Sequence, residues 1–253
     1  MIPALAANGR PRRTIFVGDI HGCRAEFEEL LESVEYAPGR DRLLLTGDAF
    51  TRGPDPLGVW RAIQAAGPEM VLGNHETWLL PQLQAIAAGG RPDALKQTRG
   101  DRLRDLAPHA ADLVAWLEGL PYAIDEPRFL LVHAGINPDT GLAGSTPDEL
   151  VYIRTWPPTG GIEGPRWHDH LAPGGKLIVF GHDAPAGLVI KRPPGAAPDS
   201  RPYLVGLDSA CVFGGSLSAY LLEEDRIVQV PARRPYVTFG GQRGVPDGSG
   251  PAT

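Results

Sequence analysis

Five short apolar segments of this chain, each long enough for one β-strand, end in the same way. A glycine stands close to the end of each segment, and an aspartate, asparagine or histidine lies beside it. The five segment ends are Val17-Gly-Asp-Ile-His21, Leu45-Thr-Gly-Asp48, Leu72-Gly-Asn-His75, Val132-His-Ala-Gly135 and Phe180-Gly-His182. Because the carboxyl ends of parallel strands converge on one edge of an α/β sheet, we expect these polar side chains to meet. Glycine at such ends lets the backbone turn sharply and approach a bound ion.

Helical patterns separate the first three of these strands. Apolar residues recur at helical spacing over residues 27–34 and again over residues 57–63, and residues 76–86 are also expected to be helical. Strands that alternate with helices in this way predict parallel strands joined by right-handed crossovers. Periodicity alone therefore predicts an α/β fold with an open parallel sheet.

The composition is that of one globular domain. The chain has 253 residues, of which 42% are hydrophobic, and a net charge of -6. No linker divides it, so we expect a single domain over residues 14–231, with flexible tails at 1–13 and 232–253. No apolar run approaches the roughly 18 residues of a membrane span, and the first residues lack the apolar core of a secretory signal. These features predict a cytoplasmic protein with no membrane partner. The net negative charge argues against a nucleic-acid partner, because binding the phosphate backbone requires a basic surface.

The polar residues at the strand ends form a donor set suited to transition metals. It consists of Asp19, His21, Asp48, Asn74, His133 and His182. Nitrogen and oxygen donors without a thiolate favour manganese, iron or zinc over a structural zinc cluster. Six donors exceed what one ion with open positions can use, and they suit two ions that share a bridging carboxylate, for which Asp48 is the candidate. Two such ions can generate hydroxide and stabilise both ends of an in-line phosphoryl displacement. The alternative is that each polar residue merely caps a turn.

The same segments resemble, in order and spacing, the signature of the calcineurin-like metallophosphoesterases. The resemblance rests on Gly18-Asp-Ile-His-Gly22, Gly47-Asp48 with Arg52-Gly53, Gly73-Asn-His-Glu76, His133-Ala-Gly135 and Gly181-His182. It covers residues 14–231 and is closest to the phosphoprotein-phosphatase branch. The resemblance implies a four-layer α/β (α+β) fold, in which a central β-sandwich is flanked by helices, in place of an open sheet.

Finer features resemble the symmetrical diadenosine tetraphosphate hydrolases and the related ApaH-like phosphatases. They lie in residues 19–23, 45–54, 133–136, 206–211 and 214–217, and residues 181–184 are closer to the ApaH-like group. Protein serine/threonine phosphatases carry an aspartate one residue before Arg52 that pairs with the catalytic histidine, whereas this chain has Thr51. A hydroxyl cannot stabilise an imidazolium as a carboxylate does, and a diphosphate leaving group needs less help from an acid than an alkoxide does. Thr51 therefore favours a phosphoanhydride substrate.

The resemblance also implies roles for individual residues. Asp19, His21 and Asp48 would hold one divalent ion, and Asp48, Asn74, His133 and His182 would hold the other. Manganese is the expected metal, with iron, zinc, cobalt or nickel as alternatives. A metal-bridging hydroxide would attack phosphorus in line, and His75 would protonate the leaving oxygen. Arg52 and Arg154 would bind phosphate oxygens through their planar guanidinium groups. A locally packed histidine and a plain surface arginine are the alternatives for His75 and Arg154.

The expected function is the hydrolysis of phosphoric anhydrides or esters in a small phosphorylated substrate, above all a dinucleoside polyphosphate of the diadenosine tetraphosphate type. A serine/threonine protein phosphatase or a general phosphomonoesterase with the same metal centre is the main alternative, and a polyphosphatase is a lesser one. A metal-loaded binding protein without turnover is disfavoured, because all the implied ligands, the histidine and the arginine of the motif are present.

Overall fold

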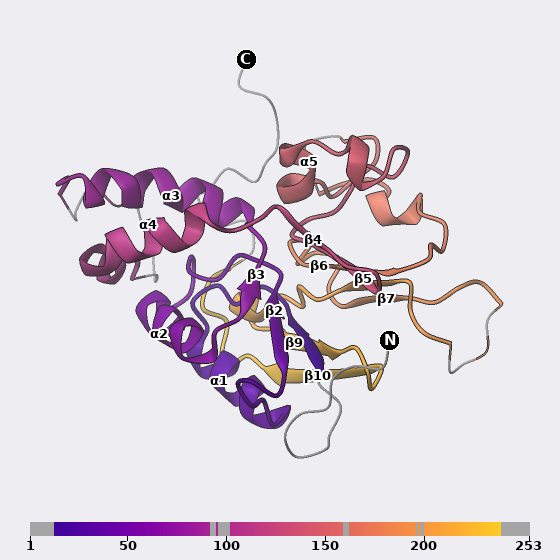
Figure 1. Ribbon diagram of the computed structural model, residues 1–253, viewed down its shortest axis with the longest axis horizontal. Helices are drawn as coiled ribbons and strands as arrows, with labels where there is room; N and C mark the ends of the chain where they lie inside the picture. Colours follow the sequence, from indigo (N-terminus) through magenta and orange to yellow (C-terminus); the bar gives the residue numbers. More distant parts are fainter. Residues whose placement is uncertain are drawn as a thin grey trace.

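Two five-stranded mixed sheets form the centre of the fold in the computed structural model (Figure 1), which describes residues 13–91, 95, 102–158, 162–195, 197 and 200–238. The first sheet has the strand order β10-β9-β1-β2-β3. Its strands are β1 (Thr14–Val17), β2 (Arg42–Leu45), β3 (Glu69–Met70), β9 (Ser216–Leu221) and β10 (Arg226–Pro231). β1, β2 and β3 are parallel, and β9 is antiparallel to both β1 and β10.

The second sheet has the strand order β4-β5-β6-β8-β7. Its strands are β4 (Ala123–Asp125), β5 (Phe129–Val132), β6 (Leu177–Phe180), β7 (Val189–Lys191) and β8 (Leu204–Gly206). β5, β6 and β8 are parallel, and the edge strands β4 and β7 run antiparallel to their neighbours. Each sheet thus contains three parallel strands whose carboxyl ends can carry site residues.

Helices cover the outer faces of both sheets (Figure 1). The first sheet carries α1 (Arg24–Ser33), α2 (Pro56–Ala66), α3 (Asn74–Ala87), the 3₁₀ helix η2 (Leu103–His109) and α4 (Ala110–Glu118). The second carries the short α5 (Pro147–Tyr152) and two 3₁₀ turns, η3 (Leu142–Gly144) and η4 (Trp167–Asp169). A last 3₁₀ turn, η5 (Cys211–Phe213), precedes β9. Among the described residues, no helix combines the length and the apolarity needed to cross a membrane.

A layer of apolar side chains joins the two sheets. In β1, Ile15 and Val17 belong to the core shared with the helices, whereas Phe16 belongs to the core between the sheets. The ring centroid of Phe16 lies 4.9 Å from that of Phe129 in β5, edge to face, a favoured geometry for aromatic pairs. The four-layer β-sandwich implied by the resemblance is confirmed, and the open sheet predicted from periodicity alone is wrong.

The described chain continues past residue 231, where the sequence analysis places the end of the domain. The main-chain N–H groups of Tyr236 and Val237 both donate to the carbonyl of Val212, and the Val237 side chain is buried. The hydroxyl of Tyr236 donates to Oε1 of the fully buried Glu26 in α1 at 2.7 Å. This segment therefore fastens α1 to the end of β10. Of the tails predicted at 1–13 and 232–253, residues 1–12 and 239–253 lie outside the described residues.

Candidate active site

Both sheets deliver polar side chains to one place, at the carboxyl ends of their parallel strands. The loops after β1 and β2 carry Asp19, His21 and Asp48, and Asn74 and His75 are the first two residues of α3, which follows β3. The second sheet supplies His133 directly after β5 and His182 after β6. All of these side chains are buried, with relative exposures of 5% or less. The structure thus brings together every side chain predicted to ligate a metal, although the strands belong to two different sheets.

Asp48 lies at the centre of this cluster. Its Oδ2 is 3.6 Å from Nε2 of His21, and its Oδ1 is 3.5 Å from Nε2 of His133. These distances are long for hydrogen bonds, but two donors bound to one ion at about 2.1 Å are themselves roughly 3.0–3.4 Å apart. Two groups of potential ligands share Asp48: one adds His21 and His75, and the other adds His133 and His182. Asp48 is therefore placed to contact two ions.

The hydrogen bonds of two histidines leave lone pairs that face the cluster. Nδ1 of His133 lies 2.8 Å from the carbonyl oxygen of Thr46, and Nε2 of His182 lies 3.2 Å from that of Tyr152. A carbonyl only accepts, so each of these nitrogens carries the proton and the other ring nitrogen carries a lone pair. The two nitrogens that carry these lone pairs, Nε2 of His133 and Nδ1 of His182, lie 3.0 Å and 3.1 Å from Oδ1 of Asn74. Acceptors that face acceptors are stabilised by a cation between them, and this arrangement fits a divalent metal ion.

Burial sets the electrostatics of the cluster. It lowers the pKa of His21 and His182 well below the usual range and that of His133 to about 3, so these imidazoles are uncharged near neutral pH. It raises the pKa of the Asp19 and Asp48 carboxyls well above their usual range, with neighbouring carboxylates adding to the effect. Metal ligation requires neutral imidazoles and ionised carboxylates, so a bound cation would reverse the upward shift of the two carboxyl pKa values.

Asp19 is oriented by two hydrogen bonds. Thr46 donates its hydroxyl to Oδ1 at 2.8 Å, and the main-chain N–H of His182 donates to Oδ2 at 2.9 Å. A side chain at Gly181 would collide with this carboxylate and with Thr46, so only glycine fits there. Asp19 lies outside the two groups that share Asp48, and it links the loop after β1 to the loop after β6. Its role as a metal ligand stays a prediction.

Glu76 connects the loop of Asp48 to the start of α3, where Asn74 lies, and the sequence analysis did not predict this role. Its Oε2 accepts the N–H groups of Asp48 at 2.7 Å and Gly73 at 3.2 Å, and its Oε1 accepts that of Ala49 at 2.8 Å. Asp48 adopts a left-handed φ of 53°, which costs energy for a residue other than glycine and needs such fixed partners. The sequence did carry a signal for this role. A glutamate three residues after the N-cap residue, here Gly73, commonly accepts hydrogen bonds from the N–H groups at the start of the helix.

The histidine predicted as the proton donor lies between a hydroxyl and a guanidinium. Nδ1 of His75 forms a short hydrogen bond with Oγ1 of Thr51, and its Nε2 accepts from Nη2 of Arg52 at 3.1 Å. Burial, with His21 and Arg52 nearby, lowers the pKa of His75 well below its usual range. His75 Nε2 is also 3.9 Å from Asp48 Oδ2, so the geometry permits a metal-ligand role beside the predicted role in proton transfer.

Both predicted phosphate-binding arginines border the cluster. Arg52 contacts His75 and lies over the ring of Phe213, with 5.3 Å from its guanidinium carbon to the ring centroid. Arg154 follows α5, and its Nη2 donates to the main-chain carbonyl of His182 at 3.4 Å. Its side chain is only 11% exposed, which argues against the alternative of a plain surface arginine.

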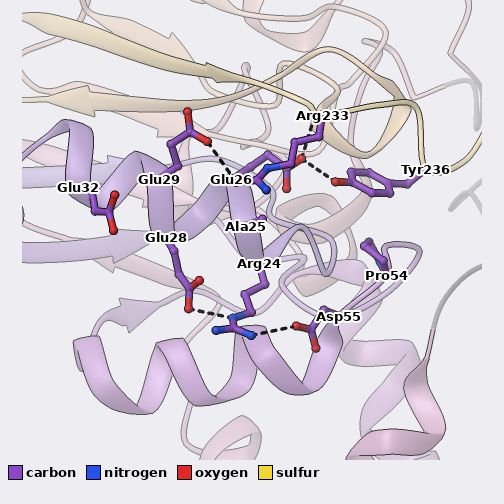
Figure 2. Close-up of a pocket in the computed structure, with 10 residues that line it drawn as sticks. All are labelled: Arg24, Ala25, Glu26, Glu28, Glu29, Glu32, Pro54, Asp55, Arg233 and Tyr236. Atoms are coloured by element: carbon purple, nitrogen blue, oxygen red, sulfur yellow. Dashed lines mark hydrogen bonds and ion pairs between the residues drawn. The ribbon is translucent and has the colours of Figure 1, made fainter.

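A cavity of about 660 Å³ lies elsewhere, between α1, the Pro54–Asp55 turn and the segment after β10 (Figure 2). Carboxylates outnumber cations in its lining: Glu26, Glu28, Glu29, Glu32 and Asp55 against Arg24 and Arg233. Figure 2 shows Arg24 between Glu28 and Asp55, to which it is ion-paired. This surface repels a phosphorylated ligand, and it includes none of the predicted site residues.

Comparisons with known proteins agree with this geometry. The family profile described as calcineurin-like phosphoesterase matches residues 12–225. A symmetrical bis(5'-nucleosyl)-tetraphosphatase of Erwinia tasmaniensis is 31% identical, over 87% of this chain and 98% of its own length. A solved structure of a candidate diadenosine tetraphosphatase has a TM-score of 0.68 and 32% identity, covering 91% of this chain and 97% of its own.

A protein serine/threonine phosphatase of Saccharomyces cerevisiae has the same fold, with a TM-score of 0.53 at 16% identity over 92% of this chain and 83% of its own. The profile match covers nearly all of the two sheets and includes every residue of the candidate metal cluster. The chain therefore belongs to the calcineurin-like phosphoesterase family and is a metal-dependent hydrolase.

Proposed function

We propose that this enzyme hydrolyses the phosphoric anhydride bonds of dinucleoside polyphosphates of the diadenosine tetraphosphate type. The observation that carries the proposal is the environment of His75, where the partner of Nδ1 is the hydroxyl of Thr51 and not a carboxylate. A histidine in this setting suits a leaving group that departs with little proton transfer. The name and the near-complete alignment of the Erwinia tasmaniensis relative support the same substrate class.

Two divalent ions, with manganese expected first and iron, zinc, cobalt or nickel as alternatives, are proposed as the cofactors. Asp19, His21 and Asp48 would hold one ion, and Asp48 would share the other with Asn74, His133 and His182. When bound, such ions neutralise phosphate oxygens and acidify water. The chain's own contribution is to fix the donors: Glu76 and Thr46 hold Asp48 and Asp19 in place before any ligand arrives.

The remaining steps follow from the three residues beside the cluster. Arg52 and Arg154 bind the oxygens of the reacting phosphate, since one contacts His75 and the other contacts the loop of His182, both at the cluster. His75, with its Nδ1 proton directed to Thr51, receives and gives a proton at Nε2. A nucleoside diphosphate is a weakly basic leaving group, so a histidine without a carboxylate partner suffices for it.

A phosphomonoesterase, including a serine/threonine protein phosphatase, is the second candidate. It is favoured by the same cluster, by the contact of Arg52 with His75 and by the fold shared with the yeast phosphatase. A polyphosphatase would use the same arrangement. Each of these alternatives releases inorganic phosphate, whereas symmetrical cleavage of diadenosine tetraphosphate yields ADP alone.

The test is a substrate panel with the metal-stripped enzyme reloaded with manganese. Diadenosine tetraphosphate, a phosphoserine peptide, p-nitrophenyl phosphate and linear polyphosphate are compared by chromatography and phosphate release. We expect ADP from the dinucleotide at the highest kcat/KM, and we expect Asn74→Ala to abolish it while His109→Ala, outside the cluster, retains it. Turnover of the peptide without cleavage of the dinucleotide would overturn the proposal.

A further inference from the structure

Arg166, an arginine at the edge of the site, has no role in the reaction described above, and it shares a carboxylate neighbour, Asp183, with Arg154. Asp183 follows His182 directly, is 3% exposed, and faces two guanidinium groups. Its Oδ2 is 2.8 Å from Nε of Arg166, and its Oδ1 is 3.9 Å from Nε of Arg154. In the part of the chain that the structure describes, neither carboxylate oxygen has a hydrogen bond of good geometry. The carboxylate therefore acts as a charged spacer between the two arginines.

Backbone contacts fix Arg166 relative to Arg154. Thr155 and Arg166 form an antiparallel bridge, and the N–H of Trp167 donates to the carbonyl of Arg154 at 3.0 Å. Trp167 is 1% exposed and packs against Gly135, in the loop that begins at His133. The strand-like pair that carries both arginines is thus anchored to one of the ligand loops.

The charge and the position of Arg154 and Arg166 suit them to binding a chain of linked phosphates. Two guanidinium groups face the Asp183 carboxylate, and the Arg166 side chain is 17% exposed, so a ligand can reach it from solvent. Arg154 donates to the main-chain carbonyl of His182, whereas Arg166 contacts the side chain of the next residue, Asp183. A phosphomonoester has no group to place there, but a chain of linked phosphates does.

We propose that Arg166, spaced from Arg154 by Asp183, forms a subsite for the phosphates next to the one that Arg154 contacts, and that Arg166 is a specificity-determining residue for phosphate chains. The inference rests on the proposed function and names the part of the substrate that this surface recognises. Arg166 binds phosphate oxygens, while Asp183 is a positioning residue that acts through the two arginines. The planar guanidinium group suits this contact because it donates paired hydrogen bonds to phosphate.

The first experiment compares Arg166→Gln with the control Arg128→Gln, which removes an exposed arginine paired with Glu223 far from the cluster. We expect Arg166→Gln to lower kcat/KM for diadenosine tetraphosphate roughly tenfold or more, mainly through KM, since charge-assisted hydrogen bonds are lost. Its kcat/KM for p-nitrophenyl phosphate stays within about threefold. An equal fall for both substrates, or no fall for the dinucleotide, would refute the subsite.

Asp183→Asn separates positioning from charge. Removing a negative charge beside two arginines would tighten phosphate binding if charge alone mattered. Because Asp183 sets the spacing of the arginines, we expect KM for the dinucleotide to rise with kcat little changed, and Asp183→Glu to recover part of the loss. A lower KM in Asp183→Asn would disprove the positioning role.

Calorimetry on the metal-free protein gives a readout independent of turnover. We expect tripolyphosphate to bind more tightly than orthophosphate, and we expect Arg166→Gln to remove this preference while Arg128→Gln keeps it. If the wild type prefers tripolyphosphate but fails to cleave the dinucleotide, the subsite stands and the proposed function fails. If the wild type cleaves the dinucleotide and Arg166→Gln behaves like the control, the subsite alone is wrong.

Discussion

Replacing Thr51 with aspartate should shift the enzyme toward phosphomonoesters. Thr51 is 1% exposed, and its Oγ1 is hydrogen-bonded to Nδ1 of His75, so an aspartate there would place a carboxylate against the imidazole. An adjacent carboxylate raises a histidine pKa by about 1–3 units, each of which corresponds to about 1.4 kcal/mol. The protonated fraction of His75 near neutral pH would therefore rise by roughly tenfold to a thousandfold.

The two substrate classes should respond differently to this change. An alkoxide leaving group depends on the proton of His75, whereas a nucleoside diphosphate does not, so kcat for monoesters should rise at least tenfold relative to the dinucleotide. The assay is the ratio of kcat/KM for a phosphoserine peptide, whose leaving group is an alkoxide, to that for diadenosine tetraphosphate, measured from pH 5 to 9. Monoester activity of Thr51→Asp should fall as the pH rises through the new, higher pKa of His75.

Thr51→Asn is the matched control, because asparagine has the shape of aspartate without its charge. Both variants should lose stability through the larger buried side chain, and only aspartate should change the substrate ratio. The metal content of each variant is measured as well, since Thr51 Oγ1 is also 3.3 Å from Nδ1 of His21. Equal substrate ratios in Thr51→Asp and Thr51→Asn would refute the role assigned to Thr51.

Three further changes test the supporting contacts. Glu76→Gln puts an N–H group against main-chain donors, so it should cost about 1–3 kcal/mol and weaken metal binding, measured by thermal unfolding and metal titration; unchanged metal affinity would contradict its role. The pKa of His168 is lowered to about 4 by burial, so this residue should contribute at most about 3 kcal/mol to the fall in stability between pH 6.5 and 4, and His168→Phe should remove that contribution in urea unfolding. Tyr236→Phe removes a donor to buried Glu26 and should cost about 1 kcal/mol, whereas the exposed Tyr122→Phe should cost almost nothing.

The side chains of the site could be predicted from the sequence because donor chemistry is carried by few residue types. Asp48, His133 and His182 follow apolar strands, and strand ends of one sense gather at one edge. The supporting contacts could not be predicted in the same way. The role of Glu76 depends on the path of two separate loops, and that of Asp183 depends on an arginine brought near by an antiparallel bridge. Neither arrangement leaves a periodic signal.

The hydrophobic pattern of the sequence also could not show that the strands are divided between two sheets. β1 is buried on both faces, so Ile15 and Phe16 give no alternation that would tell one layer from the other. The edge strands β4 and β7 are short and have partly exposed residues, and the sequence analysis did not predict them. The sandwich was anticipated only through the family resemblance.

Because Asp48 follows a strand of one sheet and His133 follows a strand of the other, any cation bound by both residues cross-links the two sheets. The folded chain then gains stability with free ion concentration, by about 2.7 kcal/mol at a hundred times the dissociation constant. A chelator should accordingly lower the melting temperature as well as the activity, and the double variant His133→Ala, His182→Ala should no longer respond to it. The concentration of free metal ion would thus set both the stability of the folded chain and the fraction of it that is active.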